Sequence, residues 1–341
     1  MQAMTRPRRL LAKRPAFGFS LIELLVSLTI GLVIAIAAMS AYLGTASSSK
    51  MSEAQSRMNE DAQAALNVLV QQIRLAGANP AQPNRADAFG RNPVYNPTYV
   101  GGSVTAYASG TTTYTVTVAP SAFSIRGCDG TFSNITNATT VPNLDSFANC
   151  GTSTLPDSIA ISYEADRFNT IPSGTAPTDC VGSAIPTTIS ATFPSGTSTT
   201  ASFRVADNRF YIASSSGVPS LMCKGIGSGT QPLVENVEDM QFMYGTVSTT
   251  EASATATVAG YLSADQVIAL APTADTAGYS TAWGKVMAVR ICVLVRSENP
   301  VVPDLASGQY YKCDGTLDTT QTDRRLRRAY TTTVVLRNRR S

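Results

Sequence analysis

Hydrophobic and polar positions divide the N-terminal quarter of the chain into two helical patterns. The first is a run of 25 residues, 19–43, that is apolar or small throughout except for Glu23. A helix of that length is roughly 37 Å long, enough to cross a hydrocarbon core of about 30 Å. We therefore expect a transmembrane segment that carries one carboxylate near its edge. Because such a carboxylate costs at least ~2 kcal/mol even when neutralised, Glu23 calls for a functional explanation.

The second pattern covers residues 50–76, where apolar side chains recur three and four residues apart. They are Met51, Ala54, Met58, Ala62, Ala65, Leu66, Leu69, Ile73 and Ala76. Charged residues occupy the other faces, which is typical of an amphipathic helix. Gly77 and Pro80 are its stop signals. No strong helix breaker lies between the two patterns, so we expect one continuous helix over residues 20–76, roughly 85 Å long.

From residue 79 onward the chain is rich in Thr, Ser, Ala and Gly, with short β-branched and aromatic runs. These runs predict strands at 114–118, 158–163, 188–193, 202–206, 209–213, 240–244, 285–295 and 330–337. A turn at Asp207-Asn208 is expected to pair 209–213 back on 202–206. Residues 81–112, 245–260 and 297–320 are expected to be loops. Trp283 is expected to be a core or domain-edge residue. The predicted fold is α+β, with the amphipathic half of the helix packed on an antiparallel sheet of a large, loop-rich β domain.

Charge is concentrated at the two ends of the chain. The first 18 residues hold five basic side chains and no acid, so the positive-inside rule places them in the cytoplasm and sends everything after residue 43 across the membrane. A cleaved secretory signal would have a shorter apolar run with a small residue behind it, whereas Gly18 precedes this one. The net charge is +3, and seven arginines lie in the last 18 residues, so the middle of the chain is acidic. Nucleic acid is therefore not an expected partner.

All six cysteines lie beyond the membrane segment, at Cys128, Cys150, Cys180, Cys223, Cys292 and Cys313. An even number in an exported domain favours disulfides. Pairing of sequence neighbours (128–150, 180–223 and 292–313) closes the shortest loops. The alternative is that some of the six are buried free thiols.

The composition argues against an enzyme or a metal protein. The chain has no histidine and no Cys-x-x-Cys pair, so neither histidine-dependent nucleophilic catalysis nor a zinc or iron–sulfur site is expected. Glu235, Glu238 and Asp239 could form a glycosidase pair, but a solvated strand face is the favoured interpretation. Residues 225–229 are glycine-rich without the lysine of a phosphate-binding loop. We expect no cofactor.

Four arginines near the C-terminus, Arg324, Arg325, Arg327 and Arg328, allow two interpretations. They could contact an acidic neighbouring protein. They could also pair with acids of the same domain, such as Glu235, Glu238 and Asp239, which is the favoured interpretation.

The segment 18–24, Gly-Phe-Ser-Leu-Ile-Glu-Leu, resembles the class III signal of type IV pilins and pseudopilins. The resemblance implies that a prepilin peptidase cuts between Gly18 and Phe19 and that the new terminal residue, Phe19, is N-methylated. It further implies that Glu23 pairs with the methylated amine of a neighbouring subunit and sets the subunit register. Ser20 stands where threonine is commoner in this family.

The C-terminal segments 233–245, 283–296, 323–330 and 333–339 resemble the PilW family of minor pilins. The resemblance implies a structural subunit of the complex that primes type IV pilus assembly, in motility and adhesion. Its implied partners are other minor pilins and the major pilin, through the N-terminal helix, and a tip adhesin. The alternative is a large J-type tip pseudopilin of a type II secretion system.

The organisation that follows has four parts. Residues 1–18 are a cleaved leader, 19–43 the transmembrane part of the helix, 44–78 its amphipathic part, and 79–341 the exported domain. The implied location is the bacterial inner membrane, with a single pass and a cytoplasmic N-terminus, followed by the periplasm and the pilus, at its tip.

Overall fold

The structure is a computed structural model that divides the chain into two compact units, Met1–Ser52 and Glu53–Ser341. It describes residues 18, 20–78, 102–109, 112–118, 124–132, 150, 156–186, 189–193, 199–226, 229–247, 257–270 and 282–339. The predicted loop at 81–101 and the greater part of that at 245–260 lie outside these residues.

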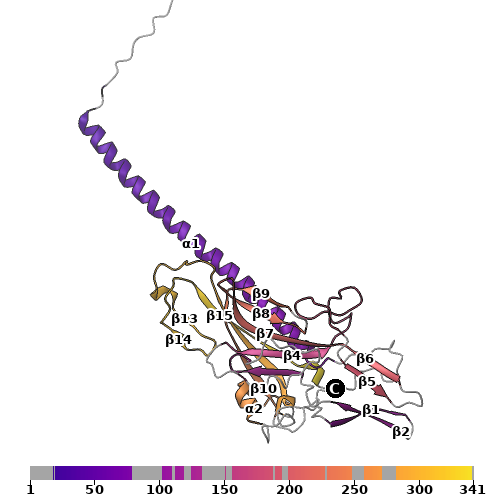
Figure 1. The fold of residues 1–341 in the computed structure, drawn as a ribbon. Coiled ribbons are helices and arrows are strands. Elements are labelled where there is room, and N and C mark those ends of the chain that lie inside the picture. Colours follow the sequence, from indigo (N-terminus) through magenta and orange to yellow (C-terminus); the bar gives the residue numbers. More distant parts are fainter. Residues whose placement is uncertain are drawn as a thin grey trace, which may run out of the picture. The chain divides into compact units, whose positions relative to one another are not determined.

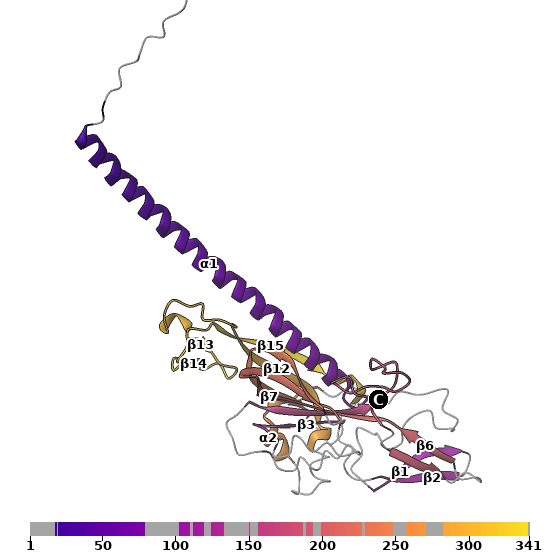
Figure 2. The same ribbon diagram turned by 45° about the horizontal axis from the view of Figure 1, so that its top comes forward.

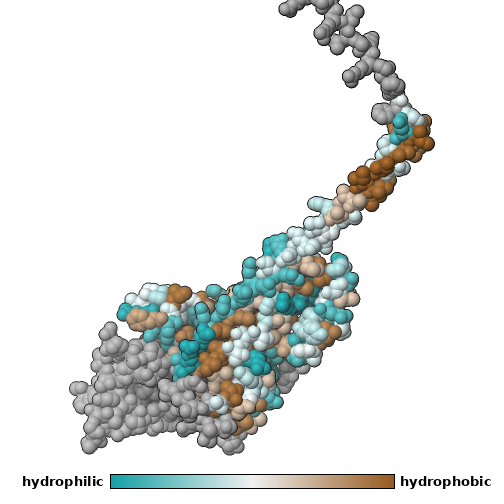
Figure 3. Space-filling view, turned by 180° about the vertical axis from the view of Figure 1, so that it is seen from behind, coloured by the Kyte–Doolittle hydropathy of each residue, from teal (hydrophilic) through white to brown (hydrophobic). Residues whose placement is uncertain are grey.

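The first unit contains the beginning of helix α1 (Leu21–Leu75). Residues 21–44 of the helix are all exposed, and the large apolar ones form the brown surface of its first half in Figure 3. An 18-residue window of α1 has a mean hydropathy of 2.5, and α1 is the one helix in the described part of the chain long and apolar enough to cross a membrane. The uninterrupted helix agrees with the prediction to within one residue at each end.

In the second unit α1 is amphipathic. Its buried residues are Met58, Ala62, Ala65, Leu69 and Ile73, all members of the predicted stripe. The helix ends as the sequence indicates, because Gly77 adopts a φ of 72°, the left-handed conformation that closes many helices. The Gly77 amide then donates to Ser162 O at 3.0 Å, which ties the end of the helix to a strand.

Two antiparallel sheets form the body of the second unit (Figure 1). The four-stranded sheet has the order β11 (Gly260–Leu262), β10 (Val237–Thr246), β12 (Val286–Arg296), β15 (Arg327–Val335). The five-stranded sheet has the order β3 (Ile125–Cys128), β4 (Ser158–Glu164), β7 (Val205–Ser215), β8 (Val218–Lys224), β9 (Thr230–Glu235).

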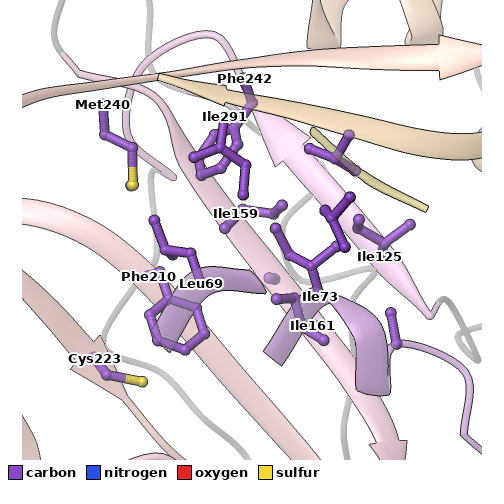
Figure 4. Close-up of a cluster of buried hydrophobic side chains, with 14 of the residues drawn as sticks. Leu69, Ile73, Ile125, Ile159, Ile161, Phe210, Cys223, Met240, Phe242 and Ile291 are labelled. Carbon is purple, nitrogen blue, oxygen red and sulfur yellow. The ribbon is translucent and has the colours of Figure 1, made fainter. Parts of the chain in front are cut away.

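Both sheets and the stripe of α1 contribute to a single core. In Figure 4, Leu69 and Ile73 from the helix lie among Ile159 and Ile161 of β4 and Ile291 of β12. Trp283 is completely buried, as the sequence predicts, and Tyr244 packs edge-on against it at a centroid distance of 4.9 Å. The fold is therefore α+β, with the amphipathic half of the long helix packed on antiparallel sheet.

Smaller elements complete the unit. β1 (Gly102–Ser109) pairs with β2 (Thr112–Val118), and β5 (Ile189–Phe193) with β6 (Thr199–Phe203); both hairpins are visible in Figure 2. The short helix α2 (Ala264–Ile268) follows β11. Between β12 and β15 lie η2 (Ala306–Gly308) and the pair β13 (Tyr310–Tyr311) and β14 (Leu317–Asp318), and η3 (Arg337–Arg339) follows β15. The predicted loops 81–112 and 297–320 therefore contain strands, which are too short or too polar to give a clear alternating pattern.

The turn predicted at Asp207-Asn208 is wrong. Both residues lie inside β7, which pairs with β4 on one side and β8 on the other. Their polar groups are satisfied within the fold: Asp207 pairs with Arg209 at 2.8 Å, and the Asn208 amide donates to Gln72 and Tyr163. The actual hairpin turn follows Ser215, at Ser216 and Gly217, which both have positive φ, as a tight two-residue hairpin requires.

Three disulfides join Cys128 to Cys150, Cys180 to Cys223 and Cys292 to Cys313. These are the pairs expected from the shortest loops. The third attaches the segment that carries β13 and β14 to the middle of β12.

Candidate functional site

Glu23 lies in the first turn of α1, one turn from the predicted cleavage point. Ser20 precedes the helix, and its amide donates to Glu23 Oε2 at 3.0 Å. Ser20 and Glu23 thus form one half of a capping box, in which the third helical residue returns to the residue that caps the helix. The carboxylate also lies at the positive end of the helix dipole. Gly18 is exposed, and Phe19 lies outside the described residues.

This arrangement gives Glu23 a local role that the sequence reading did not consider. A capping carboxylate satisfies an orphan amide of its own helix without any second subunit. The Ser-x-x-Glu spacing of residues 20–23 is the signal that could have revealed it. The cap and the expected contact with a neighbouring amine are compatible, since a carboxylate has two oxygens.

The polar residues of the apolar segment are satisfied inside the helix. Ser27 Oγ donates to Glu23 O at 2.7 Å, Thr29 Oγ1 to Val26 O at 2.8 Å, and Ser40 Oγ to Ala37 O at 2.9 Å. Such bonds remove the cost of placing hydroxyl groups in hydrocarbon. Glu23 is the one side chain of residues 21–43 that is charged at neutral pH.

The structure separates the four arginines of the C-terminal cluster. Arg327 is only 9% exposed and binds Glu238 through Nε at 2.6 Å and Asp323 through Nη1 at 2.6 Å. Arg325 donates to Ser297 O and Glu298 O and lies 3.6 Å from Asp323. These two arginines hold the segment after β12 to β15.

The two remaining arginines are exposed. Arg324 donates to Pro303 O at 3.4 Å, and the Arg328 guanidinium lies 5.6 Å from the centre of the Tyr330 ring. Neither makes a salt bridge to a described acid. Of the acids proposed from sequence, Glu238 is the partner of Arg327 and Arg296, whereas Glu235 and Asp239 do not contact the cluster.

The pKa values agree with this division. Burial lowers the pKa of Arg327, but the hydrogen bonds that it donates to Asp323 and Glu238 outweigh burial and leave that pKa above its usual range. The hydrogen bond from Arg327 holds the pKa of Asp323 below its ordinary value. The group is an internal ion-pair network.

A second carboxylate, Asp157, was not singled out by the sequence analysis. It is 5% exposed, and its two oxygens accept from the amides of Phe242, at 2.8 Å, and Gly130, at 3.2 Å. Burial raises its pKa to about 7, with a further contribution from Asp129. Asp157 thus ties the loop before β4 to β10 of the other sheet, which is a structural role.

The neighbouring Asp129 has a similar role. Its oxygens accept from the amides of Ala264 and Asp265, so Asp129 caps α2 from a distant part of the chain. Both carboxylates are occupied by main-chain amides. Among the described residues no group of three or more acids and cysteines could hold a metal ion.

A cavity of about 790 Å³ lies between the last turns of α1 and the segment 169–182. Its lining mixes apolar residues such as Val68 and Ile171 with amides and hydroxyls such as Gln71 and Thr178. Ile171 at its margin is 85% exposed. The cavity brings together no acid–base pair from the sequence analysis.

Two family models match the chain. Residues 13–39 match the prokaryotic N-terminal methylation motif, and residues 209–338 match the type IV pilus-assembly protein W family, PilW. The two matches support a type IV minor pilin of the PilW family. The first match contains Gly18, Phe19 and Glu23, and the second extends from β7 to η3 and thus includes the four-stranded sheet. The secretion pseudopilin is not better supported.

A type IV-like pilin from Thermus thermophilus is a structural neighbour with 15% sequence identity and a TM-score of 0.24. The likeness covers 56% of this chain and 82% of that one. A comparison with curated protein sequences finds no match.

The two matches also bear on the general biology of the protein. This minor pilin is anchored in the inner membrane by its N-terminal helix, with the rest of the chain exposed. Its prepilin signal implies processing by a peptidase, and its pilus-assembly domain implies contact with other pilins.

Arg327 and Arg328 are a matched pair for testing the ion-pair network. Arg327→Ala removes the shortest ion pairs of Glu238 and Asp323, which keep only Arg296 at 3.2 Å and Arg325 at 3.6 Å, and should lower the free energy of unfolding by about 1–3 kcal/mol. Arg328→Ala removes only an exposed stacking contact and should change it by less than about 0.5 kcal/mol. Denaturant unfolding of the two variants measures the difference, and equal losses would contradict the network.

Asp157 predicts a pH dependence of stability. Its pKa is about 7 in the folded chain against an ordinary value of 3.8, so between these pH values the folded chain holds a proton that the unfolded chain has released. Stability should therefore fall as pH rises from about 4 to 7, by on the order of 3 kcal/mol. Unfolding curves across this range for the wild type and Asp157→Asn isolate the effect, because only the wild type should show this component. Parallel curves would show that Asp157 does not titrate as stated.

Proposed function

We propose that the protein is a structural subunit of the complex that primes type IV pilus assembly and that it takes its place at the pilus tip. In this proposal the basic leader stays in the cytoplasm, the peptidase cuts after Gly18, and Phe19 becomes the methylated N-terminus. The parts of the mature chain are the membrane helix over 19–43, the amphipathic helix over 44–78 and the exported domain over 79–341. The protein has no catalytic role of its own.

The observation that carries the proposal is the place of Glu23 on α1. Residues 21–44 are exposed and apolar all round, so in an assembled fibre they pack against the helices of other subunits in surroundings with little water. A carboxylate there must be paired. Cleavage after Gly18 creates a cation at Phe19, four residues before Glu23 in sequence. The same amine on a neighbouring helix supplies the charge that Glu23 lacks.

The pairing favours one axial offset between neighbouring helices. If the helices slide, the carboxylate loses its cation and keeps the full desolvation cost, so the penalty acts on register more than on general stability. Glu23 would therefore govern recruitment of the subunit. Other minor pilins and the major pilin are the proposed partners, with a tip adhesin bound beyond them.

The experiment must separate the capping role of Glu23 from its charge. Glu23→Gln keeps a side-chain oxygen that can accept from the Ser20 amide, and glutamine is an accepted residue of the capping box. The same substitution removes the negative charge of residue 23. Membrane insertion should be unchanged, and the amount of the protein in sheared pili should fall at least about tenfold, the effect of roughly 1.4 kcal/mol.

Ser20→Ala is the matched control, since it changes the side chain of the capping residue, keeps the main-chain amide that donates to Glu23, and leaves the charge. We expect this variant to enter pili normally. Quantitative immunoblots of membrane and pilus fractions give both results. Normal incorporation of Glu23→Gln would contradict the proposed pairing and leave the helix cap as the role of this residue.

A further inference from the structure

The last strand, β15, forms an edge of the four-stranded sheet, and its residues 329–335 have none of the usual protection. An exposed sheet edge offers unpaired amides and carbonyls to any passing strand, and natural proteins guard it with short strands, proline, lysine, bulges or a covering segment. β15 is nine residues long, pairs with β12 without a register shift, and contains neither proline nor lysine. Its residues 329–335 are uncharged.

The other three edge strands of the two large sheets, β11, β3 and β9, are each protected against pairing with another strand. β11 has three residues and β3 has four. β9 contains Pro232, ends in Glu235, and meets β8 with a register shift. Of the four edges of the two large sheets, β15 is thus the one long and regular strand.

The register shows which groups of β15 face outward. The flanking pairs Met287–Leu336 and Ser297–Leu326 are hydrogen-bonded, through Leu336 N to Met287 O and Ser297 N to Leu326 O. Hydrogen-bonded pairs alternate along an antiparallel ladder, so the even-numbered residues of β15 bond to β12. The amides and carbonyls of Ala329, Thr331, Thr333 and Val335 therefore point away from the sheet.

These outward groups are accessible and without partners among the described residues. Thr331, Thr333 and Val335 are exposed, with Val335 46% accessible, and no hydrogen bond to a main-chain group of the four odd-numbered residues is present. In contrast, the even-numbered Tyr330 reaches α1, where its hydroxyl donates to Asn59 at 2.6 Å. The edge of β15 away from β12 is thus unpaired among the described residues over about 20 Å.

We propose that β15 accepts an extended strand from a neighbouring protein subunit, which continues the four-stranded sheet by main-chain hydrogen bonds. The strand that fits is β-branched at its centre and carries a carboxylate toward each end. This inference deepens the proposed function, because it names a contact surface for a partner in the same complex.

Charge at the two ends of the edge supports such a partner. Arg328 near the start of β15 and Arg337 just after its end are both exposed, and neither makes a salt bridge to a described acid. Their separation is roughly 30 Å along an extended chain. Acids at both ends of an incoming strand would meet these cations, and opposite charges across strands add to the stability of a ladder.

The same charges disfavour a second copy of this chain as the occupant. If two β15 edges paired antiparallel with Thr331 opposite Thr333, Arg337 of each copy would lie opposite Arg327 and beside Arg328 of the other copy. Like charges directly opposite destabilise a strand pair. A different subunit with an acidic, extended segment avoids this repulsion.

Amide hydrogen exchange tests the proposal on the full chain, first in detergent and then in isolated pili that contain it. In the chain alone the odd-numbered amides at 331, 333 and 335 should exchange fast and the even-numbered ones at 330, 332 and 334 slowly. Within pili the odd-numbered amides should slow at least about tenfold and the even-numbered ones should not change. Odd-numbered amides that stay fast in pili would overturn the proposal.

Two substitutions at one position separate the main chain from the side chain. Thr331→Pro removes an outward amide that has no partner in the fold, so β15 keeps its bonds to β12 and loses the contact with the incoming strand. Thr331→Val keeps the amide and a β-branched side chain and should behave as the wild type. Thr333→Lys, an edge-guarding residue, is the second blocking variant if proline impairs folding. Normal exchange protection in both blocking variants would contradict the proposal.

Two further experiments test whether the incoming strand is acidic and whether it comes from a different subunit. Arg328→Glu combined with Arg337→Glu should reduce the protection of the odd-numbered amides, and full protection would overturn the assignment of an acidic strand. Cross-links between copies of this chain at position 333 would overturn the assignment of a different subunit. Failure of the proposed function can be told apart from failure of the β15 contact, because in the first case the wild-type protein would be missing from pili altogether.

Discussion

The structure depends on one constraint: a single helix must be stable in two different surroundings. α1 runs from Leu21 to Leu75 without interruption. Its first part is apolar on every side, with the hydroxyls of Ser27, Thr29 and Ser40 bonded back to the helix. Its second part buries a stripe of five residues in the core of the second unit. Small and medium side chains such as Ala62 and Ala65 allow the helix to approach the strands closely.

Glu23 is the exception within the apolar part, and the geometry gives it two compatible tasks. Its carboxylate accepts from the Ser20 amide and so completes the start of the helix. In a fibre core the same group needs a cation, and processing after Gly18 would place one at residue 19. The two uses draw on different properties of the side chain, a hydrogen-bond acceptor for the cap and a negative charge for the neighbour.

The helix and the N-terminal signal could be predicted from sequence because both depend on local patterns. Spacing of apolar residues located the buried stripe, and Gly77 marked the end of the helix. The turn placed at Asp207-Asn208 failed because these polar residues are neutralised by distant partners, Gln72 and Tyr163 among them, which no local pattern reveals. Asp157 was missed for the same reason. Gly127 is a further case: a Cβ at this position would lie 1.8 Å from Tyr244 Oη, a contact visible only in three dimensions.

The central claim is that this chain works as a processed pilin whose new N-terminus lies next to Glu23. The most direct test is the identity of the N-terminal residue in protein recovered from pili, determined by sequencing and by the mass of the N-terminal peptide. The account predicts a chain that begins at Phe19 and carries one methyl group on its amine. A chain that still begins at Met1, or at any unmodified residue other than Phe19, would contradict it.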